Sequence, residues 1–121
     1  MSSLEFWAPK KIFEYITEDG KNLFRDWLES LRDRRGRAIV TTRLDKVALG
    51  NLGKTRPVNK GVHELKVDYG SGYRVYFAND GVNVILLLCG GTKRTQGEDI
   101  KLAQYCWAAY KREIGESHAY R

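Results

Sequence analysis

The sequence predicts an α+β fold in which helices pack against a small antiparallel sheet. Residues 61–89 read as three strands rich in apolar and β-forming residues, joined by two glycine-containing turns. Two stretches before them, 23–32 and a second that ends near Leu49, repeat apolar residues at helical spacing, and so does a stretch beginning near Thr95. The order is strand, two helices, three antiparallel strands and a final helix, which is typical of one small α+β domain.

The N-terminal half is expected to begin with an edge strand and to continue with the two helices. The strand lies within 7–18, where β-formers mix with charged residues, and Asp19-Gly20 ends it. Asn22 can cap the first helix. Residues 33–37 are expected to interrupt the helical pattern, and Gly50 suits the position that follows the second helix.

Two turns set the predicted register of the three strands. Asp80-Gly81 is a strong signal for a two-residue hairpin loop, which would pair Phe77 with Val84. The first turn, residues 68–72, is longer and rich in glycine. A register that places Val67 opposite Tyr73 also pairs Lys66 with Arg74, and Glu64 with Tyr76.

Four cations are expected to converge at one end of this sheet, because the second hairpin brings the end of the third strand back to the start of the second. They are Lys66, Arg74, Lys93 and Arg94, with Tyr76 and Gln96 close by. Like charges directly opposite each other destabilise a sheet, so a chain under selection for folding alone would avoid the pair Lys66–Arg74. The alternative is that both are surface cations paired with acids such as Glu64.

Charge also favours an anionic partner. The chain has 121 residues, enough for one domain, with 21 basic and 15 acidic side chains and a formal net charge of +6. Residues 54–60 are predicted to form a basic loop in which Lys54 and Arg56 either contact phosphate or belong to a solvated connector. We expect a domain over 1–121, a core of about 10–112 and a flexible tail over 115–121.

The remaining composition predicts a cytoplasmic protein with neither metal nor cofactor. Cys89 and Cys106 are expected to be buried free thiols, since two cysteines do not make a disulfide framework. His63 and His118 lack the spacing of metal ligands. Neither a signal peptide nor a membrane-spanning apolar run is evident.

A face rich in cations suits phosphate chemistry, and RNA in particular. RNA carries its own nucleophile, the 2′-hydroxyl, so its cleavage needs a base, a leaving-group acid and stabilisation of the charge that develops on phosphorus. A lysine or tyrosine whose pKa is lowered by neighbouring cations can serve as the base. Glu64, Lys66, Arg74 and Tyr76 supply candidate groups, with Lys93, Arg94 and Gln96 in the following loop.

The sequence resembles the RelE/ParE superfamily of bacterial toxins, and within it the HigB-like branch also called addiction module killer proteins. The resemblance covers roughly residues 10–112. It is carried by Arg43-Leu44, by GNLG at 50–53, GVHELK at 61–66, GYRVYF at 72–77, LLLCGGTKRTQ at 86–96, and Asp99-Ile100 with Ala103.

The resemblance implies a RelE-like fold and a toxin that cleaves mRNA, commonly on the translating ribosome. A helix-turn-helix antitoxin would neutralise it as a toxin–antitoxin hetero-oligomer. Arg74 matches the phosphate-stabilising position, and Lys66 is a second candidate for charge stabilisation or for the base. Lys93 and Arg94 match the basic loop, and Gln96 and Asp99 match the branch pattern, where Asp99 could cap the helix or orient Lys93.

This sequence departs from the best-known relatives in one respect, because it has no tyrosine between Arg94 and Gln104. Tyr76 is a possible substitute. Two alternatives follow from the same resemblance. A ParE-like toxin would bind DNA gyrase without cutting nucleic acid, and a degenerate module would bind its antitoxin and have little activity.

Overall fold

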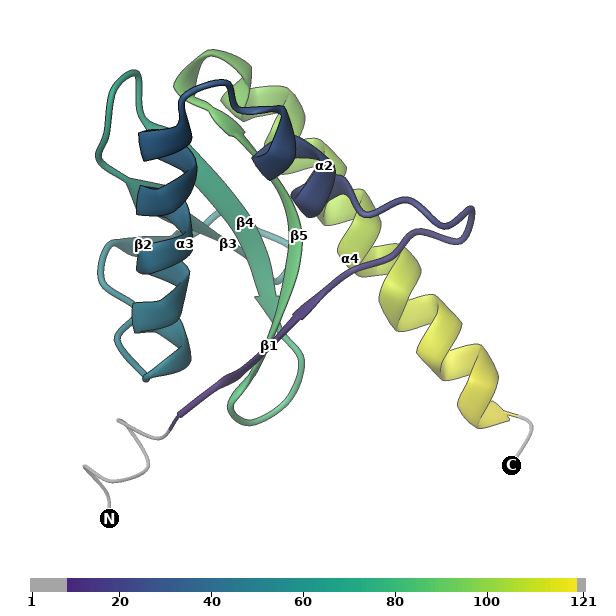
Figure 1. The fold of residues 1–121 in the computed structure, drawn as a ribbon. Coiled ribbons are helices and arrows are strands. Elements are labelled where there is room, and N and C mark those ends of the chain that lie inside the picture. The colour runs from purple at the N-terminus through teal and green to yellow at the C-terminus, as the bar shows by residue number, and fades with distance from the viewer. Residues whose placement is uncertain (1–8, 120–121) are drawn as a thin grey trace.

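The computed structural model describes residues 9–119 and has a five-stranded sheet between two layers of helix (Figure 1). The elements are β1 (Lys11–Glu14), α2 (Leu23–Ser30), α3 (Arg34–Ala48), β2 (Thr55–Pro57), β3 (Val62–Val67), β4 (Tyr73–Asn79), β5 (Val84–Thr92), the 3-10 turn η1 (Lys93–Thr95) and α4 (Gln96–Ala119). The strand order is β1-β5-β4-β3-β2. The predicted α+β class is confirmed, with one strand and two helices before the other strands and one helix after them.

The helices α2 and α3 cover one face of the sheet. Phe24 and Leu28 of α2, and Val40 and Val47 of α3, are buried against the strand residues that point to that face. Asn22 caps α2 as predicted, because its side chain accepts a hydrogen bond from the backbone N–H of Arg25 (2.9 Å).

The predicted break between the two helices is present, but it lies at residues 31–33 rather than 33–37, because α3 begins at Arg34. The side chain of Asp33 accepts hydrogen bonds from the backbone N–H groups of Arg35 (3.0 Å) and Gly36 (3.2 Å), so it caps this helix. The predicted end is confirmed, since α3 stops at Ala48 and Gly50 has a φ of 101°.

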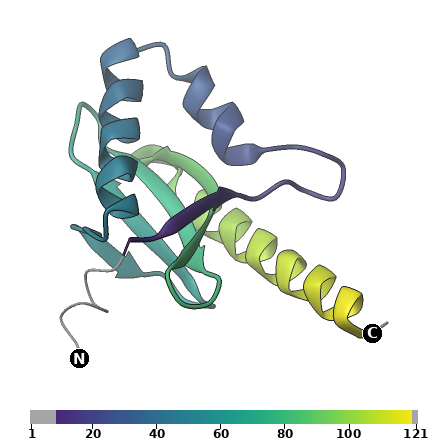
Figure 2. The ribbon, with the colours of Figure 1, turned by 60° about the horizontal axis from the view of Figure 1, so that its bottom comes forward.

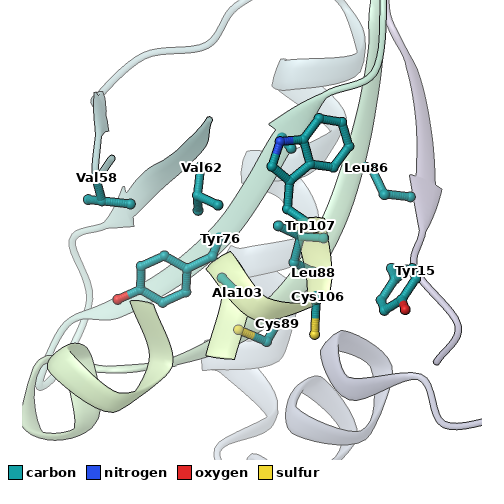
Figure 3. Close-up of a cluster of buried hydrophobic side chains, with 11 residues drawn as sticks. Tyr15, Val58, Val62, Tyr76, Leu86, Leu88, Cys89, Ala103, Cys106 and Trp107 are labelled. Carbon is teal, nitrogen blue, oxygen red and sulfur yellow. The ribbon is translucent and has the colours of Figure 1, made fainter. Parts of the chain in front are cut away.

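The helix α4 covers the opposite face, and its C-terminal part extends past the sheet (Figures 1 and 2). Ala103, Cys106 and Trp107 of α4 pack on Tyr76, Leu88 and other strand residues (Figure 3). Both cysteines are buried and free, as predicted. The tail predicted from residue 115 is helical as far as Ala119, and residues 120–121 lie outside the described part of the chain.

The first hairpin has the predicted register, and the second does not. Lys66 pairs with Arg74, and Glu64 with Tyr76. In the second hairpin, Phe77 pairs with Leu87 rather than with Val84, and a bulge between Tyr76 and Phe77 moves the register by one more residue.

The cause is a loop longer than two residues. The loop spans 80–83, where Gly81 and Asn83 have left-handed backbones with φ of 89° and 60°. A slip of three residues exchanges the two faces of a strand. Leu86 and Leu88 therefore face α4 together with Tyr76.

Two features of the sheet were not expected. The edge strand β1 pairs in parallel with β5, so the sheet is mixed rather than antiparallel. The basic loop predicted over 54–60 contains β2, an edge strand that pairs with β3 through Arg56 and Glu64. Among the described residues, no helix is both long and apolar enough to cross a membrane.

Candidate active site

Three of the four predicted cations come together where the first hairpin meets the start of α4. Two hollows, each of about 400 Å³, share Lys66 and Arg74 as walls. One is completed by Lys54, Thr55, Arg56, Glu64 and Gln96, and the other by residues 68–72 and Lys93. We call the two hollows together the Arg74 cleft. Arg94 lines neither of them.

Arg74 is the buried cation of this cleft, with 6% of the residue exposed. Its Nε lies 3.6 Å from Oε2 of Glu64, which is close enough for an ion pair but too far for a hydrogen bond. Its Nε and Nη1 atoms have no hydrogen-bond partner among the described residues. Buried N–H groups without a partner are costly, so Arg74 is the residue of the cleft whose donors are left unsatisfied by the described residues.

Glu64 is the carboxylate around which the cleft is arranged. It is buried and accepts hydrogen bonds from Arg56 Nε (2.8 Å), the Tyr76 hydroxyl (3.0 Å) and Gln96 Nε2 (2.7 Å). Burial alone would raise the pKa of Glu64, but the hydrogen bonds from Arg56, Gln96 and Tyr76 lower it below its usual value. The carboxylate therefore stays charged and joins β2, β4 and α4 to β3.

The placement of Tyr76 on an open polar face is wrong. Tyr76 does point away from the face that α2 and α3 cover, as its register implied, but α4 covers this second face and the side chain is fully buried (Figure 3). Burial and the charge of Glu64 raise the pKa of the phenol well above its ordinary value. Tyr76 therefore contacts neither solvent nor substrate directly and is unsuited to act as a base, and its role is to donate to Glu64.

The other predicted substrate-binding residues line the cleft. Lys54 bonds Asp68 (2.6 Å), and Lys66 lies 3.7 Å from the same carboxylate. Asp68 was not singled out in the sequence. It stands two residues after Lys66, and alternate residues of a strand share a face, so the spacing could have indicated it. Gln96 begins α4 and is held by Glu64.

The polar residues at the start of α4 have a structural arrangement of their own. The hydroxyl of Thr95 donates to Asp99, and Asp99 packs against Gly91, where an added Cβ would come within 1.8 Å of a carboxylate oxygen. Burial raises the pKa of Asp99. This carboxylate therefore fixes the turn that carries Lys93, rather than pairing with Lys93 itself. Among the side chains that the structure describes, no three His, Cys, Asp or Glu residues gather as a metal site requires.

The fold and the cleft define a small α+β protein with a basic cleft, in which a buried arginine, with two nitrogens unpaired among the described residues, is flanked by two exposed lysines. No family model matches the chain. An uncharacterized protein of Haemophilus influenzae (strain ATCC 51907 / DSM 11121 / KW20 / Rd) is 43% identical over 81 residues, which are 67% of this chain and 82% of the relative. The chain belongs to the same family as that protein.

Proposed function

We propose that this protein is the toxin of a type II toxin–antitoxin module, and that it is a metal-independent endoribonuclease acting on mRNA. The observation that carries the proposal is Arg74. Its Nε and Nη1 are buried and have no hydrogen-bond partner among the described residues, and the residue lines a cleft whose other cations are Lys54, Arg56, Lys66 and Lys93. Such a guanidinium matches the two oxygens of a phosphate, and it gains most where negative charge increases in the transition state.

The proposed reaction uses the substrate's own nucleophile. The 2′-hydroxyl attacks the adjacent phosphorus, the bond from phosphorus to the 5′-oxygen breaks, and the products are a 2′,3′-cyclic phosphate and a 5′-hydroxyl. Arg74 donates to the non-bridging oxygens. Lys66 and Lys93 flank Arg74 and are the candidates for moving the protons at the 2′-hydroxyl and at the leaving oxygen. Tyr76 is too buried to act as the base.

The rest of the proposal follows the resemblance to RelE-like toxins. The mRNA would be cut on the ribosome, translation would stop, and a helix-turn-helix antitoxin would neutralise the toxin in a hetero-oligomer. The formal charge of +6 supports a nucleic-acid substrate, since the phosphate backbone dominates such binding.

Controlled expression in bacteria tests the proposal. Wild type, Arg74→Ala, Arg74→Lys and the control Arg112→Ala on the exposed side of α4 are induced in turn. Growth is followed, and new mRNA 5′ ends are mapped by primer extension. We expect Arg74→Ala to lower cleavage about a hundredfold or more, because it removes donors to the transition state. Arg74→Lys should be nearly as defective, because an ammonium cannot reproduce the planar fork. Arg112→Ala should behave as wild type.

Circular dichroism of each purified variant shows whether it is folded. Growth arrest with intact mRNA would contradict the nuclease and favour a gyrase-binding toxin. Wild-type expression without arrest would contradict the toxin assignment itself.

A further inference from the structure

A second basic surface lies on the other side of the sheet edge, between α3 and the end of β3. This groove has a volume of about 510 Å³, and we call it the α3 groove. Its charged walls are Arg35, Arg43, Lys46, Lys54, Lys66 and Asp68. Five of these six side chains are cations. Lys54 and Lys66 also line the Arg74 cleft, so the groove and the cleft are joined around the short edge strand β2.

The cations of α3 follow the axis of the helix. Arg35 and Lys46 are 11 positions apart, which corresponds to about 16 Å at the rise of an α-helix. Both side chains are exposed, and neither has a carboxylate partner among the described residues.

Arg43 differs from the other cations of the groove because its guanidinium is hydrogen-bonded to the protein backbone. Its guanidinium donates to the backbone carbonyls of Asn51 (3.3 Å) and Leu52, and burial lowers its pKa. Gly53 has a φ of 61°, and a Cβ there would come within 1.8 Å of the guanidinium. Arg43 therefore fixes the connection from α3 to β2, which places Lys54 at the junction of groove and cleft.

The floor of the groove is apolar, formed by Ile39 and Val67, and no aromatic side chain lines it. Bases that stack on a protein do so on aromatic rings, whereas phosphates are held by cations without regard to sequence. These walls therefore suit a sugar–phosphate backbone rather than a specific base.

We propose that the α3 groove binds the backbone of single-stranded RNA as it continues from the Arg74 cleft around the edge strand β2. The inference rests on the proposed function and adds the path and the minimum length of the substrate. A short oligonucleotide fills the cleft alone, and a longer one also reaches Arg35 and Lys46.

The test measures binding of fluorescent RNA by anisotropy across a series of salt concentrations. The probes are a trinucleotide and a dodecanucleotide, both 2′-O-methylated so that they cannot be cleaved. Wild type is compared with Arg35→Gln/Lys46→Gln, with Arg74→Ala, and with the control Lys101→Gln/Arg112→Gln. The control removes the same two charges from exposed positions of α4, and thermal unfolding confirms that every variant is folded.

We expect Arg35→Gln/Lys46→Gln to bind the dodecanucleotide on the order of tenfold more weakly than wild type. Its slope of log K against log salt should be shallower by about 1.4, because a single strand releases about 0.7 counterion for each phosphate neutralised. Binding of the trinucleotide should be unchanged. Arg74→Ala should weaken binding of both probes.

Equal losses in the two double variants would overturn the inference, because net charge alone would then explain them. If the trinucleotide depends on Arg74 and the dodecanucleotide gains nothing from Arg35 and Lys46, the groove is not a site while the proposed function stands. If binding of the dodecanucleotide depends on Arg35 and Lys46 but not on Arg74, the groove inference is supported and the active site assigned to Arg74 is contradicted. A wild type that binds neither probe would overturn the groove inference, and the proposed function would then be decided by the primer-extension experiment.

Discussion

Glu64 and Arg74 lie on adjacent strands, with Oε2 of the carboxylate 3.6 Å from Nε of the guanidinium, and both side chains are buried. Glu64 is satisfied by three other donors, from Arg56, Tyr76 and Gln96. Nε and Nη1 of Arg74 have no hydrogen-bond partner within the part of the chain that the structure describes. The carboxylate thus compensates the buried charge of Arg74 without occupying its hydrogen bonds, and those bonds remain available to a ligand.

Removal of this carboxylate should destabilise the protein strongly. Glu64→Ala is expected to lower the free energy of unfolding by about 3–5 kcal/mol, because it leaves a buried arginine without its counter-charge. Glu64→Gln should cost less, since the amide oxygen still accepts hydrogen bonds. Urea denaturation measures both. A loss in Glu64→Ala no larger than that of a surface substitution would show that the pair is not buried in solution.

The same carboxylate should make stability depend on pH in the acidic range. The folded-state pKa of Glu64 lies below its ordinary value of 4.5, so its contribution to stability is fully present above that pH. This stabilisation is lost as the pH falls below about 4.5 toward the folded-state pKa. The cause is that Glu64 has the higher pKa in the unfolded chain, so the unfolded chain binds the proton first. Urea midpoints measured from neutral to acidic pH should fall less steeply in Glu64→Gln than in wild type, and parallel curves would contradict this account.

Tyr76→Phe separates a structural role from a catalytic one. The hydroxyl donates to a buried carboxylate, so its removal should cost roughly 1.5–3 kcal/mol of stability. Cleavage by the folded variant should remain close to that of wild type, whereas loss of a general base lowers rates by about a hundredfold or more. Primer extension at a temperature where both proteins are folded compares their rates of mRNA cleavage. A loss of about a hundredfold would show that Tyr76 acts as a base.

The sequence predicted the class of the fold and the register of one of the two expected hairpins, for physical reasons that differ between the hairpins. Once the position of the first turn is known, the pairing of the two strands places Lys66 opposite Arg74. That pair lies at the Arg74 cleft, so it locates the candidate site. The second loop depends on a left-handed Asn83, which Asp80-Gly81 does not specify, so the faces of β5 were exchanged. Nearly continuous apolar strands also do not reveal that α4 covers Tyr76. The parallel partner of β1 is equally unspecified, because a four-residue strand carries little pairing information.

Lys93 and Arg94 should prove unequal although they are adjacent. Lys93 lines the cleft beside Arg74 and Lys66, and Arg94 does not. We expect Lys93→Ala to lower mRNA cleavage by at least about tenfold, and Arg94→Ala to have a much smaller effect, because electrostatic stabilisation of a transition state requires proximity. Primer extension on induced cultures compares the two variants at matched protein levels. The opposite order would show that the 3-10 turn η1 rearranges when substrate binds.

Asp68 opposes anion binding, and its neutralisation should therefore strengthen it. Its carboxylate engages Lys54 at 2.6 Å and Lys66 at 3.7 Å, and these are the lysines shared by the cleft and the α3 groove. Asp68→Asn frees both lysines for phosphate, so it should tighten binding of both RNA probes several-fold at low salt and steepen the salt dependence. The matched control is Asp26→Asn on the exposed side of α2, which raises the net charge equally. Equal tightening by the two variants would mean that long-range charge, rather than release of these lysines, governs RNA binding.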